Sequence, residues 1–141
     1  TDLSAEMIAI ARERAAGAGA DPERVVFSVA PLGEVAPATP PDAVLAMNLL
    51  HLVEDRAGAL ARIRAMLASG GVFAASTACL GDFMPWFRWV APLGRALGRL
   101  PHVEVFTEAA FLEELSAAGF AVERRFRPSR SAALFTLARA V

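Results

Sequence analysis

Apolar residues recur at intervals of three and four in several segments of the chain, and this spacing predicts helices. The first such segment is AEMIAIARERA, which follows Ser4. A serine in that position accepts a hydrogen bond from a free N–H of the first helical turn, so Ser4 is a good N-cap. Gly17 and Gly19 follow the segment and suit a helix end. The predicted helix would have Met7, Ile8, Ala11 and Ala15 on its apolar side.

The same spacing predicts two more helices. One runs from about Glu54 to Leu67 and ends before a Ser-Gly-Gly turn. The other follows Thr107, which suits an N-cap, and carries Phe111 and Leu115 on its apolar side before Gly119 ends it. Between these two lies a stretch, 81–101, that we expect to be helical only in part, because Pro85 and Pro92 interrupt it.

Runs of consecutive apolar residues predict buried strands. DAVLAMNLL, residues 42–50, is expected to be a central parallel strand covered on both faces. The last two apolar runs, at 120–126 and 132–139, are joined by a short segment that contains RPSR, which predicts a hairpin. Elsewhere strands and helices alternate, apart from a proline-rich loop at 31–41, and this alternation predicts an α/β fold of three layers with a mostly parallel sheet. The other strands are expected at Val25–Val29, 72–77, 120–126 and 132–139.

Composition narrows the class of protein. The chain has 141 residues, 55% of them hydrophobic, which suits one domain with a real core. Its net charge of −1 gives no indication of nucleic-acid binding. No apolar run reaches the ~18 residues of a membrane span. The single cysteine, Cys79, fits a reducing, cytoplasmic location. All the basic residues are Arg, and with the abundant Ala this suggests a GC-rich bacterial genome.

Four motifs in this order resemble the class I S-adenosylmethionine-dependent methyltransferases, in particular the group that acts on small molecules. They are DLSAEMIAIARERA, DAVLAMNLLHLVED, LASGGVFAAST and FLEELSAAGFAVERRF. The resemblance implies a Rossmann-like three-layer sandwich with a C-terminal antiparallel hairpin. It also implies that a first strand, a glycine-rich turn and a first helix would stand before Thr1. The chain is therefore expected to be one partial domain, 1–141, that by itself is inactive and binds S-adenosyl-L-methionine weakly or not at all.

The resemblance also suggests cofactor-binding residues. Asp2 stands where similar enzymes hold an acid that accepts hydrogen bonds from both ribose hydroxyls. Leu3 and Met7 would pack near the adenine, although Met7 is equally well explained as a core residue. Ala30 and Pro31 occupy the place where the family commonly has an adenine-binding acid, which weakens that contact. Asp2 could instead serve only the start of the helix.

Two further candidates follow the strand at 42–50. Asn48 would lie at the carboxyl end of that strand, where open α/β sheets bind ligands, and similar enzymes place this position near the methyl group. Its alternative role is to cap the next turn. His51 could act as a general base near neutral pH, or be structural. No metal ligands are apparent.

The insert at about 82–100 carries the densest group of aromatic residues. In the family this insert often covers the acceptor, so it is expected to be a lid over a small apolar or aromatic substrate. The alternatives are packing of both Trp residues on the sheet edge, and a membrane-surface helix with Arg88, Arg95 and Arg99 toward the headgroups. Stable membrane insertion is not expected. The proposed lid residues are Phe83, Trp86, Phe87 and Trp89.

Two rival functions stay open on the sequence. A nicotinamide-dependent dehydrogenase also has an acid at the end of its second strand, but the terminal hairpin favours the methyltransferase. A non-catalytic or degenerate Rossmann-like remnant would explain the missing glycine-rich turn. The arginines around the hairpin, Arg124, Arg125, Arg127 and Arg130, are better explained as a solvated sheet edge than as an anion site. The methyl acceptor and the oligomeric state do not follow from the sequence.

Overall fold

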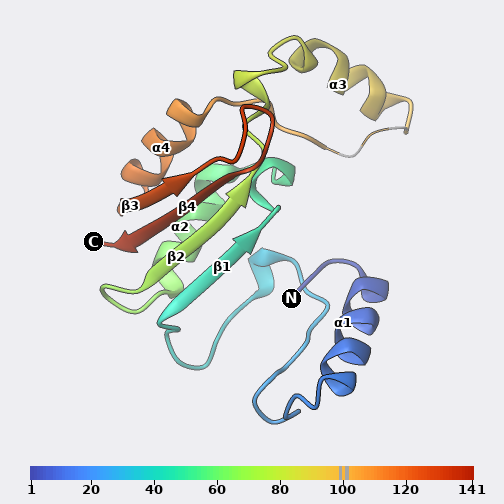
Figure 1. The fold of residues 1–141 in the computed structure, drawn as a ribbon, viewed down its shortest axis with the longest axis vertical. Coiled ribbons are helices and arrows are strands. Elements are labelled where there is room, and N and C mark those ends of the chain that lie inside the picture. Colours follow the sequence, from blue (N-terminus) through green and yellow to red (C-terminus); the bar gives the residue numbers. More distant parts are fainter. Residues whose placement is uncertain (99, 101) are drawn as a thin grey trace. The chain divides into compact units, whose positions relative to one another are not determined.

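The computed structural model describes residues 1–98, 100 and 102–141. They form two compact units, Thr1–Ala36 and Pro37–Val141, whose elements Figure 1 labels. The expectation that 1–141 forms a single domain stays a prediction. Arg99, which belongs to the expected lid and was assigned above to a membrane-facing side, lies outside the described residues.

The first unit contains helix α1, Ala5–Gly17. Its beginning and end are those predicted. The Ser4 hydroxyl accepts a hydrogen bond from the N–H of Met7, and Gly19 has the positive φ of 69° that favours glycine. Ile8 is the buried residue of α1, whereas Met7 is 53% exposed. The interpretation of Met7 as a core residue was therefore wrong.

The buried strand predicted at Val25–Val29 was also wrong. This segment is extended, but in the described part of the chain it makes only one isolated parallel bridge, between Asp2 and Val29, and Val26 is 80% exposed. A strand needs a neighbouring strand along its length, and within this unit the segment is paired only at Asp2. A short 3-10 helix, Leu32–Glu34, interrupts the proline-rich loop that follows.

The second unit is built on a four-stranded sheet. β1 and β2 are parallel, and β4 is antiparallel to both β2 and β3, so β1, β2 and β3 run in one direction and β4 in the other. The predicted C-terminal hairpin is thus confirmed, with a connection, 127–133, longer than expected. The strands are β1 Ala43–Met47, β2 Val72–Thr77, β3 Phe120–Phe126 and β4 Leu134–Ala140, in the order β1-β2-β4-β3.

Helices α2, Arg56–Met66, and α4, Glu108–Ala117, lie on one face of this sheet (Figure 1). Both were predicted, and the Thr107 hydroxyl caps α4 by accepting from Ala110 N–H. The sheet and these two helices form the expected α/β Rossmann-like arrangement. Fully buried side chains from both layers form the core, among them Leu60, Ile63, Phe73, Phe111, Leu115 and Leu134.

The prediction that β1 is a central strand covered on both faces was wrong. β1 comes first in the strand order, and Leu45 is 68% exposed while Ala46 is buried. Successive residues of a strand point to opposite faces. Because α2 and α4 cover one face, Ala46 is buried against them, and Leu45 and Met47 point to the other.

Helix α3, Phe87–Ala96, runs through Pro92, so the expected break there was wrong. Proline cannot donate the hydrogen bond of an interior helical N–H, but the loss concerns one bond, and the helix continues beyond it. Two short 3-10 helices complete the unit, Leu50–Leu52 after β1 and Leu80–Asp82 after β2. The second lies close to Phe106, whose carbonyl accepts from Gly81 N–H at 2.8 Å.

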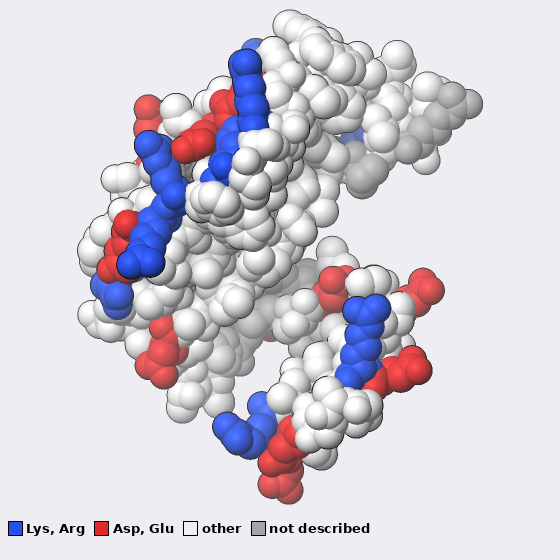
Figure 2. Space-filling model, in the orientation of Figure 1, with Lys and Arg blue, Asp and Glu red and all other residues white. Residues whose placement is uncertain are grey.

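Charged side chains of both signs gather over the β3–β4 hairpin (Figure 2). Arg127 is not the solvated residue expected, since its side chain is 13% exposed and pairs with Asp82 at 2.8 Å and Glu108 at 3.1 Å. Arg125 pairs with the same Glu108, and Arg130 donates to the Asp82 carbonyl. These bonds tie the hairpin connection to the 3-10 helix after β2 and to the start of α4.

Candidate functional site

Asp2 and Ala30 are adjacent in the first unit. Asp2 N–H donates to the carbonyl of Ser28 at 3.3 Å, and Ala30 N–H donates to the carbonyl of Asp2 at 3.1 Å. These two bonds place the proposed ribose-binding acid beside Ala30 and Pro31, the residues proposed for the adenine side. The sequence separates them by almost thirty positions, so the chain reversal after α1 brings them together.

The Asp2 carboxylate has one structural contact. Its Oδ1 accepts from Ser4 N–H at 2.8 Å, which supports the start of α1. Its other oxygen makes no hydrogen bond with the described residues, and Leu3 beside it is 72% exposed. The helix-start role and a ligand role are therefore compatible, because they use different oxygens of the same carboxylate.

Asn48 and His51 belong to the second unit and follow β1. Asn48 is the described non-glycine residue with positive φ, 52°, a conformation that asparagine tolerates better than most residues. Its N–H donates to the carbonyl oxygen of Ser76 at 2.9 Å and to the hydroxyl at 3.0 Å. The Ser76 hydroxyl donates to Asn48 Oδ1 at 3.2 Å. Asn48 itself is exposed.

His51 lies next to Thr77 and Ala78, the two residues that follow Ser76 at the end of β2. Its Nδ1 is 3.4 Å from both the Thr77 hydroxyl and Ala78 N–H. A backbone N–H can only donate, so this contact favours a lone pair at Nδ1 and the proton at Nε2. Burial lowers the pKa of His51, because desolvation disfavours the charged imidazolium. His51 is therefore a neutral hydrogen-bond donor near the end of β2, close to Asn48.

Ser76 and Arg56 are residues that the sequence did not single out. Ser76 fixes Asn48 across two strands, and no local pattern indicates such a pairing. Arg56 is 8% exposed and bridges Glu104 at 2.5 Å and Glu114 at 2.5 and 2.6 Å. Its guanidinium also lies 3.8 Å from the centre of the Phe106 ring. It joins α2, α4 and the segment 102–106, so it supports the strand ends indirectly.

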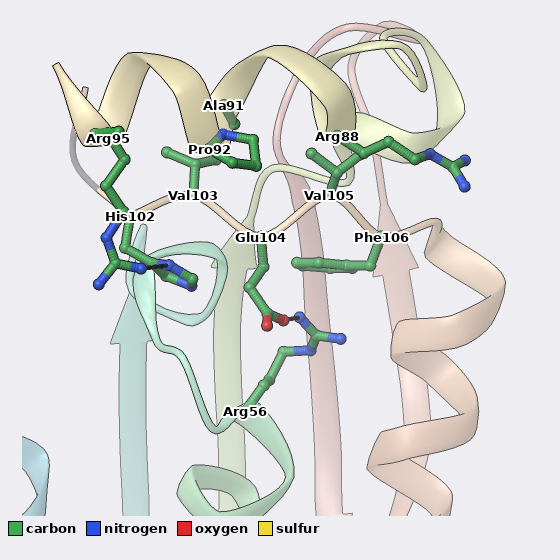
Figure 3. A pocket seen from close by; sticks show the side chains of 11 residues that line it. Arg56, Arg88, Ala91, Pro92, Arg95, His102, Val103, Glu104, Val105 and Phe106 are labelled. Carbon is green, nitrogen blue, oxygen red and sulfur yellow. Dashed lines mark hydrogen bonds and ion pairs between the residues drawn. The ribbon is translucent and has the colours of Figure 1, made fainter. Parts of the chain in front are cut away.

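A cavity of about 670 Å³ is lined by α3 and the segment 102–106 (Figure 3). Glu104 N–H donates to the His51 carbonyl at 2.9 Å, so this segment is attached to the 3-10 helix after β1. The proposed lid aromatics do not line the cavity. Trp86 and Trp89 are 56% and 79% exposed, which contradicts the alternative of Trp packing on the sheet edge.

Two searches of the described residues bear on other classes of protein. No helix among them is long and apolar enough to cross a membrane. They also contain no group of three or more His, Cys, Asp or Glu side chains that could hold a metal ion.

Comparison with known proteins gives one family and many related folds. The profile described as "Methyltransferase domain" matches residues 1–73. No curated protein matches the chain in sequence. A Burkholderia thailandensis 1,6-didemethyltoxoflavin-N1-methyltransferase, solved with bound 1,6-didemethyltoxoflavin and S-adenosylhomocysteine, is 25% identical, with a TM-score of 0.65 over 84% of this chain and 52% of its own.

Two other solved structures share the fold. A Planctomyces limnophilus O-methyltransferase family 2 protein in complex with apigenin is 21% identical, with a TM-score of 0.73 over 99% of this chain and 41% of its own. An S-adenosylmethionine-dependent methyltransferase from Mesorhizobium loti is 23% identical, with a TM-score of 0.72 over 97% of this chain and 77% of its own. The chain thus spans about half the length, or less, of the first two structures.

Proposed function

Because this chain belongs to the methyltransferase domain family, we propose that it takes part in the transfer of a methyl group from S-adenosylmethionine to a small molecule. The observation that carries the proposal is the polar strand end formed by Asn48, held by Ser76, and by His51, held near Thr77. The carboxyl ends of strands are where open α/β sheets bind their ligands. No feature of the site favours the dehydrogenase alternative.

The first unit offers groups that fit the nucleoside part of this cofactor. The free oxygen of Asp2 is available to accept from a ribose hydroxyl, and the exposed Leu3 and Met7 provide apolar surface for an adenine ring. Ala30 and Pro31 lie beside Asp2 and offer backbone groups in place of the acid that the family commonly has there. The assignment of these five residues to the cofactor is a proposal.

When bound, S-adenosylmethionine supplies a sulfonium that is already an activated leaving group. The chain therefore has only to orient the acceptor and exclude water. We assign Asn48 to the methionine side of the cofactor. His51, proposed from the sequence as a base, carries its proton at Nε2, so its role is better described as donating a hydrogen bond to the acceptor. Phe83, Trp86, Phe87 and Trp89 stay candidates for a lid over an apolar or aromatic acceptor.

Titration calorimetry with S-adenosylhomocysteine tests this proposal. The sample is the protein produced from the complete reading frame, because the relatives are longer than residues 1–141. Binding with a Kd on the order of micromolar, about −8 kcal/mol, is expected. NAD is the control and should not bind. A protein that binds NAD and not S-adenosylhomocysteine would overturn the proposal. The cytoplasmic location expected from Cys79 stays a prediction.

A further inference from the structure

Helix α3 turns its apolar side away from the cavity. Its small and basic residues line the cavity instead, among them Arg88, Ala91 and Arg95 (Figure 3). A helix that packs by hydrophobic burial alone would show the opposite orientation. The arrangement makes the cavity more polar than the sequence of α3 suggests. The outward residues are Trp89, Val90 and Leu93 of α3 and its two cap residues, Trp86 and Leu97, all at least 45% exposed.

The arginines that line the cavity differ in how far they are neutralised. Arg56 is held by two carboxylates, Glu104 and Glu114. Arg95 pairs with Glu54 at 2.5 Å. Arg88 has no carboxylate partner among the described residues, and its one hydrogen bond there runs from Nε to the Pro85 carbonyl. Its two terminal nitrogens are therefore available to a ligand.

His102 provides a second available donor. Arg95 Nη1 lies 2.9 Å from His102 Nδ1, and because a guanidinium can only donate, Nδ1 must accept. Nδ1 then carries no proton, so its distance of 3.8 Å from the Glu54 carboxylate does not represent an ion pair. In the neutral ring the proton is left at Nε2. That nitrogen is buried and has no partner among the described residues. A buried N–H without an acceptor indicates a missing partner.

We propose that this cavity binds a small organic anion whose carboxylate pairs with Arg88 and whose far end accepts a hydrogen bond from His102 Nε2–H. Arg88 and the Arg95–His102 pair lie at opposite ends of the cavity in Figure 3. Two helical turns separate Arg88 from Arg95, about 10 Å along the axis, so an elongated ligand fits. Between them, Val103 and Val105 offer apolar contact. A volume of about 670 Å³ is typical of small-molecule sites.

Identifying this anion as the methyl acceptor rests on the proposed function, whereas binding of the anion does not. The proposal narrows the acceptor class from any apolar or aromatic molecule to one that also carries a carboxylate. Such a ligand would leave no charge of the cavity unpaired, and it would satisfy the orphaned His102 donor.

Three probes test the two contacts in titration calorimetry on the protein from the complete reading frame. They are 4-methoxybenzoate, its neutral amide 4-methoxybenzamide, and 4-methylbenzoate, which lacks the distal acceptor. The methoxybenzoate should bind at least about tenfold more tightly than the amide, because a charge-assisted hydrogen bond is lost in the amide. It should also bind about fivefold more tightly than 4-methylbenzoate. Equal binding of all three probes, or none, would overturn the proposal.

Two variants assign these preferences to residues. Arg88→Gln should abolish the preference for the carboxylate over the amide but keep the preference for methoxy over methyl. His102→Phe should abolish the preference for methoxy over methyl but keep the preference for the carboxylate over the amide. Arg124→Gln, an exposed arginine of β3, is the matched control and should behave as wild type. If Arg88→Gln kept the full carboxylate preference, the assigned site would be wrong. The probe series on the unaltered protein remains decisive if His102→Phe does not fold.

The same titrations separate this proposal from the proposed function. Binding of S-adenosylhomocysteine without discrimination among the three probes would overturn the anion site and leave the methyltransferase function standing. Discrimination among the probes without any binding of S-adenosylhomocysteine would support the anion site and argue against methyl transfer.

Discussion

Ser76 holds Asn48 through both its backbone and its side chain. The Ser76 carbonyl and hydroxyl oxygens both accept from Asn48 N–H, and the hydroxyl donates back to Asn48 Oδ1. Ser76 is 1% exposed, while Asn48 is exposed at the strand end with φ of 52°. The buried serine therefore fixes a carboxamide whose NH₂ group makes no hydrogen bond with the described residues.

Replacing Ser76 by Ala should consequently weaken S-adenosylhomocysteine binding about fivefold, the equivalent of about 1 kcal/mol, because Asn48 Oδ1 loses its donor while Asn48 N–H keeps the Ser76 carbonyl as acceptor. Asn48→Gly should also weaken it, because glycine keeps the positive φ but removes the carboxamide. Calorimetry on both variants and on the double variant gives the coupling free energy between Ser76 and Asn48 in cofactor binding. Additive losses would mean that Ser76 does not act through Asn48. Ser69→Ala, in an exposed turn, is the control.

Asp2→Asn separates the two roles of Asp2. The amide oxygen can still accept from Ser4 N–H, so the start of α1 is retained, but the negative charge toward the ribose is lost. S-adenosylhomocysteine affinity should fall at least about tenfold, since charge-assisted hydrogen bonds contribute roughly 1.5–3 kcal/mol each. The melting temperature should change little. Unchanged affinity in Asp2→Asn would remove this residue from the proposed site.

Arg56→Met should destabilise the protein by about 2 kcal/mol, because it breaks a partly buried ion-pair network. The substitution keeps an apolar stem but leaves the partly exposed carboxylates of Glu104 and Glu114 without their shared partner. Urea denaturation measures the change. Arg124→Met, at an exposed site, should stay within about 0.5 kcal/mol of wild type. Equal effects of the two substitutions would contradict a structural role for Arg56.

His51 should make stability depend on pH in a defined direction. Burial lowers its pKa below the ordinary 6.5, so the unfolded chain binds the proton more readily than the folded one. The free energy of unfolding is therefore highest, as far as His51 is concerned, above pH 6.5. It decreases as the pH falls from there through the lowered pKa of His51. Unfolding free energies of wild type and His51→Gln between pH 7.5 and 5, as a rough window, test this. Parallel curves would show that His51 is not the residue responsible.

Cys79 should be almost inert in the folded protein. Burial raises the pKa of its thiol to about 11, so very little of the reactive thiolate is present near neutral pH. Iodoacetamide at about pH 8, close to the pKa of a free thiol, should modify it far more slowly in buffer than in urea. Mass spectrometry follows the reaction. Modification in buffer at the rate of free cysteine would show that the thiol is accessible.

Local sequence determined the elements whose causes are local. Ser4 and Thr107 cap α1 and α4 with their own hydroxyls, and Gly19 and Gly119 adopt positive φ beyond the ends of those helices. The hairpin strand 120–126 has the predicted bounds. For the caps and the glycines, the decisive hydrogen bond or dihedral angle involves residues a few positions apart, and the hairpin strand pairs with the next strand along the chain.

Predictions failed where burial depends on a distant neighbour. Val25–Val29 has the composition of a strand, yet among the described residues only Asp2 pairs with it. Leu45 lies in a run as apolar as a central strand, but its face of the sheet is not covered by α2 or α4. The apolar side of α3 predicts a buried face, yet Trp89 is largely exposed.

The candidate site divides in the same way. Asp2 was recognisable from the motif that begins with it, DLSAEMIAIARERA, and Asn48 and His51 from their place at the end of the predicted strand at 42–50. The contacts of Ser76 with Asn48, of Arg56 with Glu104 and Glu114, and of Arg95 with His102 join positions that no sequence spacing relates. A hydrogen bond or ion pair needs atoms within a few ångströms, and only the tertiary structure decides which distant residues come that close.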